Sequence, residues 1–394
     1  MHILFDHLIE RVVFFTCLGR YLSHTRIVLF NKQTLERIHD LLRCSDNIVD
    51  APLRCDRWTA SSLLQESIRR GEVELAQRAA CTLNAFDRSA IWRRLVVIAC
   101  EDVGVGDIDA LLETLLAATS TDFRRQCGEA SVLGAVVRRL AEAVKDRSAD
   151  YLACAAKDHS DLSEICDFCR KASINQRLQF LADTSQPLAK RAVAAWFASS
   201  INWRYDQQVR GGDVRALAAT YRDLGVGEEL FHSIVLAARK APEPLVILVP
   251  LVWLEVQRSG STGIRSDAVP QTKTIAGVPL YAFDTHTRTG KRAIERLISE
   301  NKPFRDCLVR FLAKGSPKKA AEIAAFYADG APVARRLDWA RSDSLERLGI
   351  EADFIEAGLR LEGIGPVREA MNAALEQLNE IRAELWMAAA EARV

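Results

Sequence analysis

Residues 62–107 decide the fold class of this chain, and they read SLLQESIRRGEVELAQRAACTLNAFDRSAIWRRLVVIACEDVGVGD. We interpret the stretch as three short helices, the third of which carries Ile91, Leu95 and Ile98 at positions i, i+4 and i+7. A second apolar stripe runs beside the first, so most of this helix is expected to be buried. The stretch therefore predicts helices that pack on one another.

An acidic pair, Glu101 and Asp102, follows the third helix. The helix macrodipole disfavours carboxylates at a C-terminus, so both acids need a cation or donated hydrogen bonds. The nearest basic residues in the sequence are Arg69, Arg70, Arg93 and Arg94. We interpret Arg94, Glu101, Asp102 and Asp107 as a structural ion-pair corner in which Asp107 caps the next helix. A ligand site is the alternative.

Most of the remaining chain also has helical periodicity, with Gly or Pro between the periodic segments. The sequence therefore predicts an all-α protein, built as an irregular multi-helix array because no repeat of fixed period is present. The expected sections are a peripheral helical segment at 1–52, a helical domain at 53–157, a helical extension at 158–257, a loop at 258–279 and a basic helical section at 280–394.

The candidates for a membrane span are two apolar runs, VVFFTCLG at 12–19 and PLVILVPLVWLEV at 244–256. Both are shorter than the roughly 20 residues that span a bilayer, so no membrane partner is expected. Two prolines predict that the second run is a buried, broken segment. The ten cysteines show no disulfide framework, and no secretory signal is recognised, so we expect reduced thiols and a cytoplasmic protein.

Charge is nearly balanced overall, at +1 over 394 residues, so attraction to nucleic acid requires a local patch. Residues 286–347 provide one, with fourteen Lys and Arg against eight Asp and Glu. Such an excess suits phosphate contacts, which need no sequence readout. A solvated helical face is the alternative.

The string FDTHTRTGKRAIERLI, at 283–298, opens the basic section. Asp284 and His286 can orient one another as an acid and imidazole pair, while Arg288, Lys291 and Arg292 can hold an anion where a helix begins. No adjacent nucleophile is recognisable. The plain alternative is a capped helix start followed by a solvated basic face, which is the interpretation we prefer.

The same string also superficially resembles a phosphate-binding loop. Thr285 replaces the first glycine of that motif and Arg292 replaces its metal-binding hydroxyl, so no nucleotide-binding motif is intact. We therefore expect no cofactor, and an enzyme is the less favoured class.

A second candidate phosphate contact is LEGIGPVREAMNAAL, at 361–375. Its Gly363, Ile364 and Gly365 resemble the turn of helix-hairpin-helix motifs, which presents backbone amides to a DNA phosphate. Glu362 and Glu369 depart from that pattern, and an interhelical turn with Pro366 at the first helical position is the alternative.

Metal binding is weighed for Cys154, His159, Cys166 and Cys169, which lie close together in sequence. Cys166 and Cys169 share a helical face, and thiolates with an imidazole suit zinc. Structural zinc sites usually have two paired ligand halves, whereas this segment has one. Buried cysteines without metal are therefore the preferred interpretation.

A resemblance to a known family supports the helical interpretation of residues 58–156. The run RRLVVIACEDVGVGD at 93–107, the Gly break before it and AVVRRLAEAVKDRSADYLACAA at 135–156 resemble the C-terminal helical domain of the MgsA/RarA replication-associated recombination ATPases. The resemblance implies a clamp-loader-collar-like helical domain, self-association into a homo-oligomer and a genome-maintenance context. The AAA+ ATPase module of that family has no counterpart here, so no catalytic residue is carried over.

The resulting hypothesis is a non-catalytic helical module of DNA replication or recombination. It would bind DNA through Arg288, Lys291, Arg292, Gly363 and Gly365, and a separate AAA+ ATPase or replication protein is the expected partner. One alternative is a helical protein-protein adaptor without DNA contact. Another is an enzyme that acts on a phosphorylated ligand near Asp284 and His286.

Overall fold

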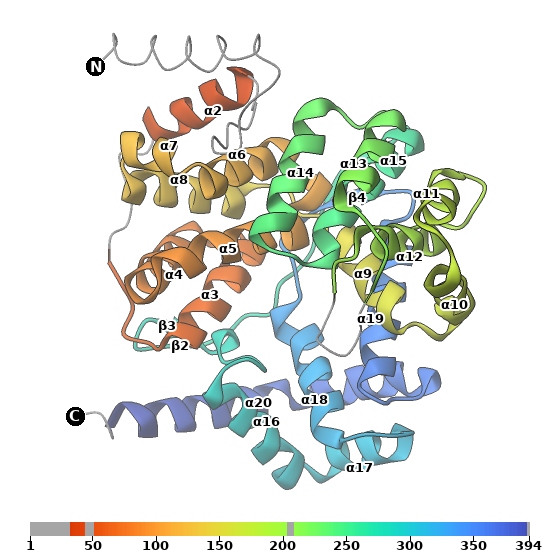
Figure 1. The fold of residues 1–394 in the computed structure, drawn as a ribbon. Helices are drawn as coiled ribbons and strands as arrows, with labels where there is room; N and C mark the ends of the chain where they lie inside the picture. Colours follow the sequence, from red (N-terminus) through yellow and green to blue (C-terminus); the bar gives the residue numbers. More distant parts are fainter. Residues whose placement is uncertain (1–31, 44–50, 203–208, 392–394) are drawn as a thin grey trace.

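The computed structural model describes residues 32–43, 51–202 and 209–391. Within these residues nineteen α-helices alternate with short turns and a few short strands, so the predicted all-α multi-helix array is confirmed (Figure 1). The segment predicted at 1–52 is described only at 32–43 and 51–52, and the apolar run at 12–19 lies outside the described residues.

The helices of the first half cross one another in an irregular stack rather than a regular repeat (Figure 1). They are α2 (Lys32–Arg43), α3 (Arg57–Arg70), α4 (Val73–Phe86), α5 (Arg88–Ile98), α6 (Ile108–Thr119), α7 (Thr121–Cys127), α8 (Glu129–Glu142), α9 (Ser148–Asp158), α10 (Ser163–Lys171), α11 (Ile174–Ala182) and α12 (Leu188–Ser199). A π-helical turn η2 (Ala99–Val103) and 3₁₀ turns η3 (Gly104–Gly106) and η4 (Ser160–Leu162) join some of them.

The second half continues with helices and contains all the strands of the described chain. Its helices are α13 (Val214–Asp223), α14 (Glu228–Lys240), α15 (Pro244–Ser259), α16 (Arg288–Glu300), α17 (Lys302–Phe311), α18 (Pro317–Ala325), α19 (Ser342–Glu356) and α20 (Ile364–Glu391). The shorter elements are β1 (Thr262–Ser266), β2 (Thr274–Ile275), β3 (Val278–Pro279), η5 (Leu280–Ala282), a π-helical turn η6 (Phe326–Gly330), β4 (Arg335–Trp339) and η7 (Leu361–Gly363).

Capping side chains account for where several of these helices begin. Asp56 starts α3 by accepting the N–H groups of Trp58 at 2.9 Å and Thr59 at 3.1 Å. Asp87 starts α5 in the same way, with two acceptor distances of 2.9 Å. Gly71 ends α3 in the left-handed conformation, with φ 75°, which costs glycine little.

Two hydrophobic clusters form the interior. The first takes apolar side chains from α2 to α15 and η5, and the second takes them from α16, α17, α18 and α20. The long helix α20 contributes to both, because Leu378 packs in the second cluster and Trp386 in the first. The Trp386 ring lies 4.8 Å from that of Phe283, between ring centroids.

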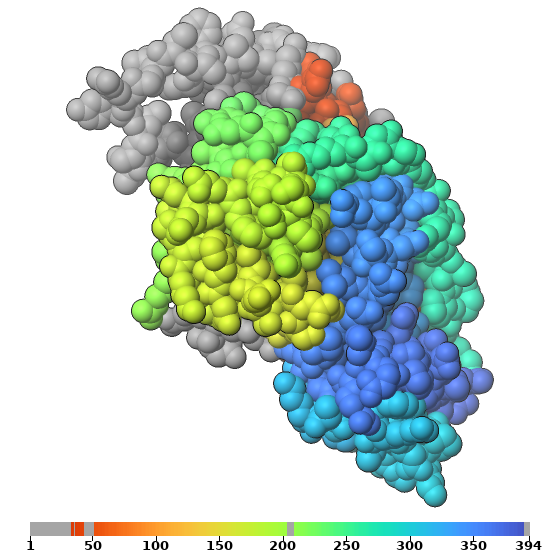
Figure 2. Space-filling view, turned by 90° about the vertical axis from the view of Figure 1, so that its right-hand side faces the viewer, coloured from red at the N-terminus to blue at the C-terminus, as the bar shows by residue number. Residues whose placement is uncertain are grey.

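The helix α19 also joins the two clusters. Its Ala352 packs in the first cluster and its Phe354 in the second. On the surface, residues of α10 to α12 lie beside residues of the last third of the chain, which Figure 2 shows in yellow-green and blue.

The predicted loop at 258–279 contains ordered strands that the sequence did not predict. β1 pairs antiparallel with β4, with Thr262 opposite Trp339 and Ser266 opposite Arg335. β2 and β3 form a small hairpin whose turn residues Ala276 and Gly277 have φ of 51° and 80°. The sequence did not predict these strands because they are too short to show a clear alternation of apolar and polar residues.

The prediction that 244–256 is broken by prolines is wrong, because α15 continues through Pro250. Pro244 occupies the first turn, where no N–H donor is needed. Near Pro250 the Tyr221 hydroxyl donates to the carbonyl of Ile247 at 2.9 Å. No described helix is both long and apolar enough to cross a membrane.

We expect Tyr221→Phe to lower the free energy of unfolding by about 0.5–1.5 kcal/mol, because the buried side chain loses its hydrogen bond to the Ile247 carbonyl. Urea denaturation followed by circular dichroism measures this change. Tyr151→Phe is the matched control, since that hydroxyl makes no hydrogen bond within the described chain. Equal midpoints for both variants would contradict a stabilising hydrogen bond from Tyr221 to α15.

Candidate functional site

The acidic corner forms around the buried guanidinium of Arg69 in α3. Its Nε donates to Asp102 Oδ1 at 2.6 Å and its Nη2 donates to Glu101 Oε1 at 2.8 Å. Both acids lie in η2, whose π-helical turn replaces the helix C-terminus expected there. The Nη1 of Arg69 donates to the carbonyl of Gly330 at 3.0 Å. One side chain therefore joins α3, η2 and η6.

Arg147, from the segment before α9, is the second cation of this corner. Its Nη2 lies 2.6 Å from Asp150 Oδ2 and 3.4 Å from Glu101 Oε1. Its Nε lies 3.4 Å from Asp102 Oδ1. Both arginines lie over the ring of Phe326, at 5.3 Å for Arg69 and 5.5 Å for Arg147. The sequence prediction did not include Arg147.

Residues 144–147 reach the corner because two glycines leave room for their backbone. A Cβ on Gly104 would lie 2.6 Å from the carbonyl oxygen of Asp146, and one on Gly106 would lie 2.6 Å from that of Val144. Gly104 also has φ 49°, which glycine tolerates. The Asp146 N–H closes η2 by donating to the carbonyls of residues 102 and 103, at 3.0 and 3.1 Å.

Two residues that the sequence prediction placed in the corner have different partners. Arg94 donates to the amide oxygen of Gln65, and Gln65 Nε2 donates to Asp102 Oδ2 at 2.8 Å. Arg94 therefore reaches the acids through an amide. Asp107 caps α6 by accepting an N–H of its first turn at 3.0 Å, and it pairs with Arg139 at 2.7 Å. Asp107 thus belongs to a separate ion pair.

The chemistry of the corner favours a structural role. Burial raises the pKa of Glu101, but the cations Arg69, Arg147 and Arg94 outweigh burial and hold it below its usual value. Burial raises the pKa of the neighbouring Asp146 to about 6. A cavity of about 20 Å³ touches the corner beside Arg147, which is room for a water molecule and for no larger ligand.

Side-chain hydrogen bonds from Asp284 and Thr287 hold the turn that precedes α16. Asp284 Oδ1 accepts the backbone N–H of His286 at 2.8 Å and that of Thr287 at 3.2 Å. The Thr287 hydroxyl caps the helix by accepting the N–H of Gly290 at 3.0 Å. A Cβ on Gly290 would lie 1.8 Å from the Asp284 carbonyl oxygen, so this glycine serves packing. Asp284 contacts the backbone of His286, and the two form no acid and imidazole pair.

Three cations follow this turn on one face of α16. Arg288, Lys291 and Arg292 are all exposed, and none has an ion-pair partner within the described chain. Their spacing of three and four residues places them on neighbouring turns. The N–H groups of Arg288 and Thr289 have no acceptor within the described residues, which leaves the positive end of the helix open.

The turn at 363–365 offers less to a phosphate than the sequence suggested. The Gly363 N–H donates to the carbonyl of Arg360 at 2.9 Å. A Cβ on Gly363 would lie 2.3 Å from Phe311, so the glycine packs against α17. Gly365 is exposed with open space beside it. Since α20 begins at Ile364, Pro366 is its third residue rather than its first.

The four residues weighed for zinc do not form a metal centre. Within the described residues no group of three or more His, Cys, Asp or Glu side chains could hold a metal ion. The Cys166 thiol donates to the carbonyl of Ala156 at 3.6 Å, and the Cys154 thiol to Asp150 at 4.0 Å. Burial raises the pKa of Cys169 to about 12, which disfavours a thiolate.

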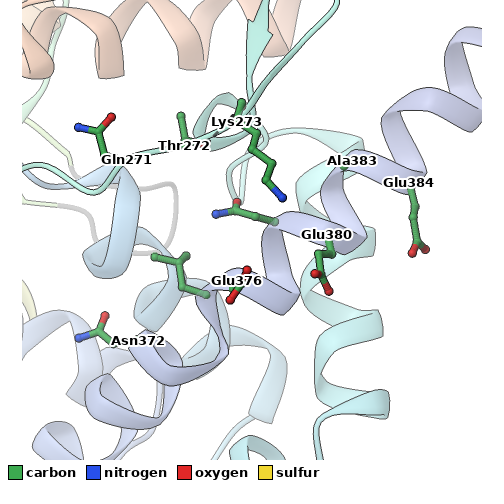
Figure 3. Close-up of a pocket in the computed structure, with 10 residues that line it drawn as sticks. Gln271, Thr272, Lys273, Asn372, Glu376, Glu380, Ala383 and Glu384 are labelled. Atoms are coloured by element: carbon green, nitrogen blue, oxygen red, sulfur yellow. Dashed lines mark hydrogen bonds between the residues drawn. The ribbon is translucent and has the colours of Figure 1, made fainter.

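A groove of about 750 Å³ runs between residues 271–273 and α20 (Figure 3). Its helical wall carries Glu376, Glu380 and Glu384 at intervals of four, and Lys273 extends toward them from the opposite side. Glu384 is paired with Arg296 of α16 at 2.6 Å. This acidic wall repels phosphate groups, so the groove is not a candidate for a phosphate site.

One further acid, Glu66, is buried where α3 meets α20 and η6. Its Oε2 has no hydrogen-bond partner within the described chain. Burial, with Asp284 and Asp329 nearby, holds the pKa of Glu66 well above its usual 4.5, although Arg69 and Arg382 lower it. Sequence reasoning missed Glu66, although its position shortly after Leu63 and Leu64 in a short helix indicates burial.

Comparison of the chain with protein-family models, with curated proteins and with solved structures finds no match. The resemblance to the MgsA/RarA helical domain stays a prediction.

We expect Arg69→Met to lower the free energy of unfolding by about 3–5 kcal/mol, because it leaves Asp102 and Glu101 buried with one cation fewer. Arg93→Met is the control, since Arg93 is exposed and has no ion pair within the described chain, and a change within about 0.5 kcal/mol is expected. Thermal and urea denaturation measure both. A small effect at Arg69 would show that the corner does not hold the fold together.

Glu66→Gln is expected to change how stability depends on pH. The folded chain keeps the Glu66 proton to higher pH than the unfolded chain, so the wild-type contribution is fully present below about pH 4.5 and is lost as the pH rises toward the folded pKa. Glutamine carries no titrating proton. The stability advantage of the variant should therefore grow from acid to neutral pH in urea denaturation, and parallel curves would contradict it.

Proposed function

We propose that this chain is a non-catalytic, DNA-binding module of replication or recombination. The observation that carries the proposal is the trio Arg288, Lys291 and Arg292, exposed, without ion-pair partners in the described chain and placed at the open start of α16. Cations and helix N-terminal amides together favour phosphate oxygens. Because these contacts read no bases, the expected binding is to the backbone and independent of sequence.

Other cations of residues 286–347 support the proposal less. Arg296 pairs with Glu300 and Glu384, both at 2.6 Å, and Lys318 pairs with Glu295 at 2.5 Å. Arg336 is held by carboxylates beside β4, including Glu346 at 2.6 Å. The excess of charge counted along the sequence is thus partly neutralised in the fold, whereas the three cations in the first two turns of α16 form no ion pair within the described chain.

The wider setting rests on the family resemblance alone. That resemblance supports self-association through residues 53–157 and a separate AAA+ ATPase or replication protein as partner. The catalytic alternative near Asp284 and His286 loses support, because the Asp284 carboxylate is engaged by two backbone N–H groups. A protein-protein adaptor without DNA contact is the remaining alternative, and it is an outcome of the experiment below.

We expect reversal of Arg288, Lys291 and Arg292 to glutamate to weaken binding to duplex DNA and to flatten its salt dependence. Each lost phosphate contact reduces the slope of log affinity against log salt by about 0.9. Fluorescence anisotropy with a labelled duplex, titrated at several salt concentrations, measures both quantities. Thermal stability should change little, because exposed charges contribute little to folding.

The matched control reverses Lys171, Arg215 and Arg239, three exposed cations on other helices that have no ion pair within the described chain. This control changes the net charge by the same amount, so it separates a local contact from general electrostatic attraction. Equal losses in both triple variants would contradict a site on α16. No binding of the wild-type chain at low salt would favour the adaptor.

A further inference from the structure

A cleft of about 440 Å³ opens among α3, α4, α5 and residues 241–243, away from the cations of α16. The three helices lie together in Figure 1. The cleft volume falls in the range of about 300–1,000 Å³ that is usual for sites of small ligands. Apolar side chains of Leu83, Ala90 and Val97 contribute to its lining.

Two aromatic rings stand exposed at this cleft. Trp58, in the first turn of α3, is 54% exposed, and Phe86, the last residue of α4, is 56% exposed. Both line the cleft. The guanidinium of Arg57 lies 4.5 Å from the centroid of the Trp58 ring. Burying these rings in the chain itself would have stabilised it, so two solvated rings at one cleft indicate a surface for a planar ligand.

The charges at the cleft favour an anion. Arg57, Arg93 and Arg94 line it, and none makes a salt bridge within the described chain. The Nε of Arg94 is buried without a hydrogen-bond partner in the described chain, although its Nη2 donates to Gln65. Three guanidinium groups therefore outnumber the acids at the cleft.

Two acids line the same cleft, and its three arginines outnumber them. Asp87 accepts the N–H groups of Ser89 and Ala90, each at 2.9 Å, as the cap of α5. Burial, with Glu101 nearby, raises the pKa of Glu243, although Arg94 and Arg93 lower that pKa. The cleft therefore retains a positive excess.

We propose that this cleft binds single-stranded nucleic acid, with unpaired bases stacked on Trp58 and on Phe86 and the flanking phosphates on Arg57 and Arg93. Stacking platforms bordered by arginines are the usual means of holding single strands without reading their sequence. The inference deepens the proposed function, because it assigns the unpaired strand to α3, α4 and α5 and the duplex backbone to α16.

The helical walls exclude one way of binding a peptide, the addition of an extended strand. A peptide bound in that way is held largely by main-chain hydrogen bonds to a sheet edge. Here the walls are helices, whose backbone groups bond within the helix and offer no such edge. What the cleft does offer is ring faces and guanidinium groups, which match bases and phosphates.

The test is binding of a labelled short oligothymidylate to the full chain, followed by fluorescence anisotropy. Trp58→Ala and Phe86→Ala should each weaken binding about tenfold, since a stacked base contributes about 1–3 kcal/mol. Trp58→Phe keeps a ring face and should retain most of the affinity. Binding of duplex DNA should be unchanged in all three variants. Thermal unfolding checks that these exposed positions leave the fold intact.

The outcomes separate the two proposals. If alanine at both ring positions leaves oligothymidylate binding unchanged while reversal of the α16 cations abolishes duplex binding, the cleft is wrong and the proposed function stands. If the ring variants lose oligothymidylate binding while the α16 reversal leaves duplex binding unchanged, the cleft stands and the α16 site is wrong. Binding that depends on Trp58 for a labelled peptide of Asp and Trp, without oligothymidylate binding, would overturn the cleft in favour of a peptide.

Discussion

The fold depends on the contacts of Arg69 with Asp102, Glu101 and the carbonyl of Gly330. These contacts connect a helix near the start of the described chain to a turn far along it. A guanidinium suits this position because its five donors point in fixed directions within one plane. A buried ion pair is weak evidence for stability, since desolvation offsets attraction, but it is sensitive to the loss of one partner. The corner therefore couples the positions of α3, η2 and η6, since each supplies a partner of the same guanidinium group.

The arginines that hold the fold together are buried, and those that could contact a ligand are mostly exposed. Buried arginines, such as Arg69 and Arg382, donate their hydrogen bonds to carboxylates and carbonyls of the chain itself. Arg288 and Arg292 at the start of α16, and Arg57 and Arg93 at the cleft beside Trp58, have no such partners in the described residues. A count of charges along the sequence includes both the buried, paired arginines and the exposed, unpaired ones. The fold shows which arginines are exposed, and only these are candidates to bind an anion.

The all-α class followed from helical periodicity, and the corner followed in part from two acids that needed cations. Arg69 was among the nearest cations by sequence, but Arg147 was not, because the KDRSAD run at 145–150 looks like solvated surface until Gly104 and Gly106 bring it inward. The strands β1 and β4 are distant in sequence and too short to show a period. Pro250 predicted a break, and a helix buried on all sides accommodates it instead. The features that were not predicted, such as the position of Arg147 and the pairing of β1 with β4, thus depend on long-range contacts that no local pattern encodes.

The sharing of α19 and α20 between the two hydrophobic clusters has a consequence for how the chain matures. Arg69 and Lys145 form hydrogen bonds with backbone groups of residues 330–337. The ring of Phe283 packs against that of Trp386. The amino-terminal helices can form early, yet their core stays open at those positions until the later segments have left the ribosome. During that interval the faces of α3 and α9 that pack on η5 and α19 remain exposed. Chaperone occupancy during translation is therefore expected to persist until the α20 segment emerges and both cores close together.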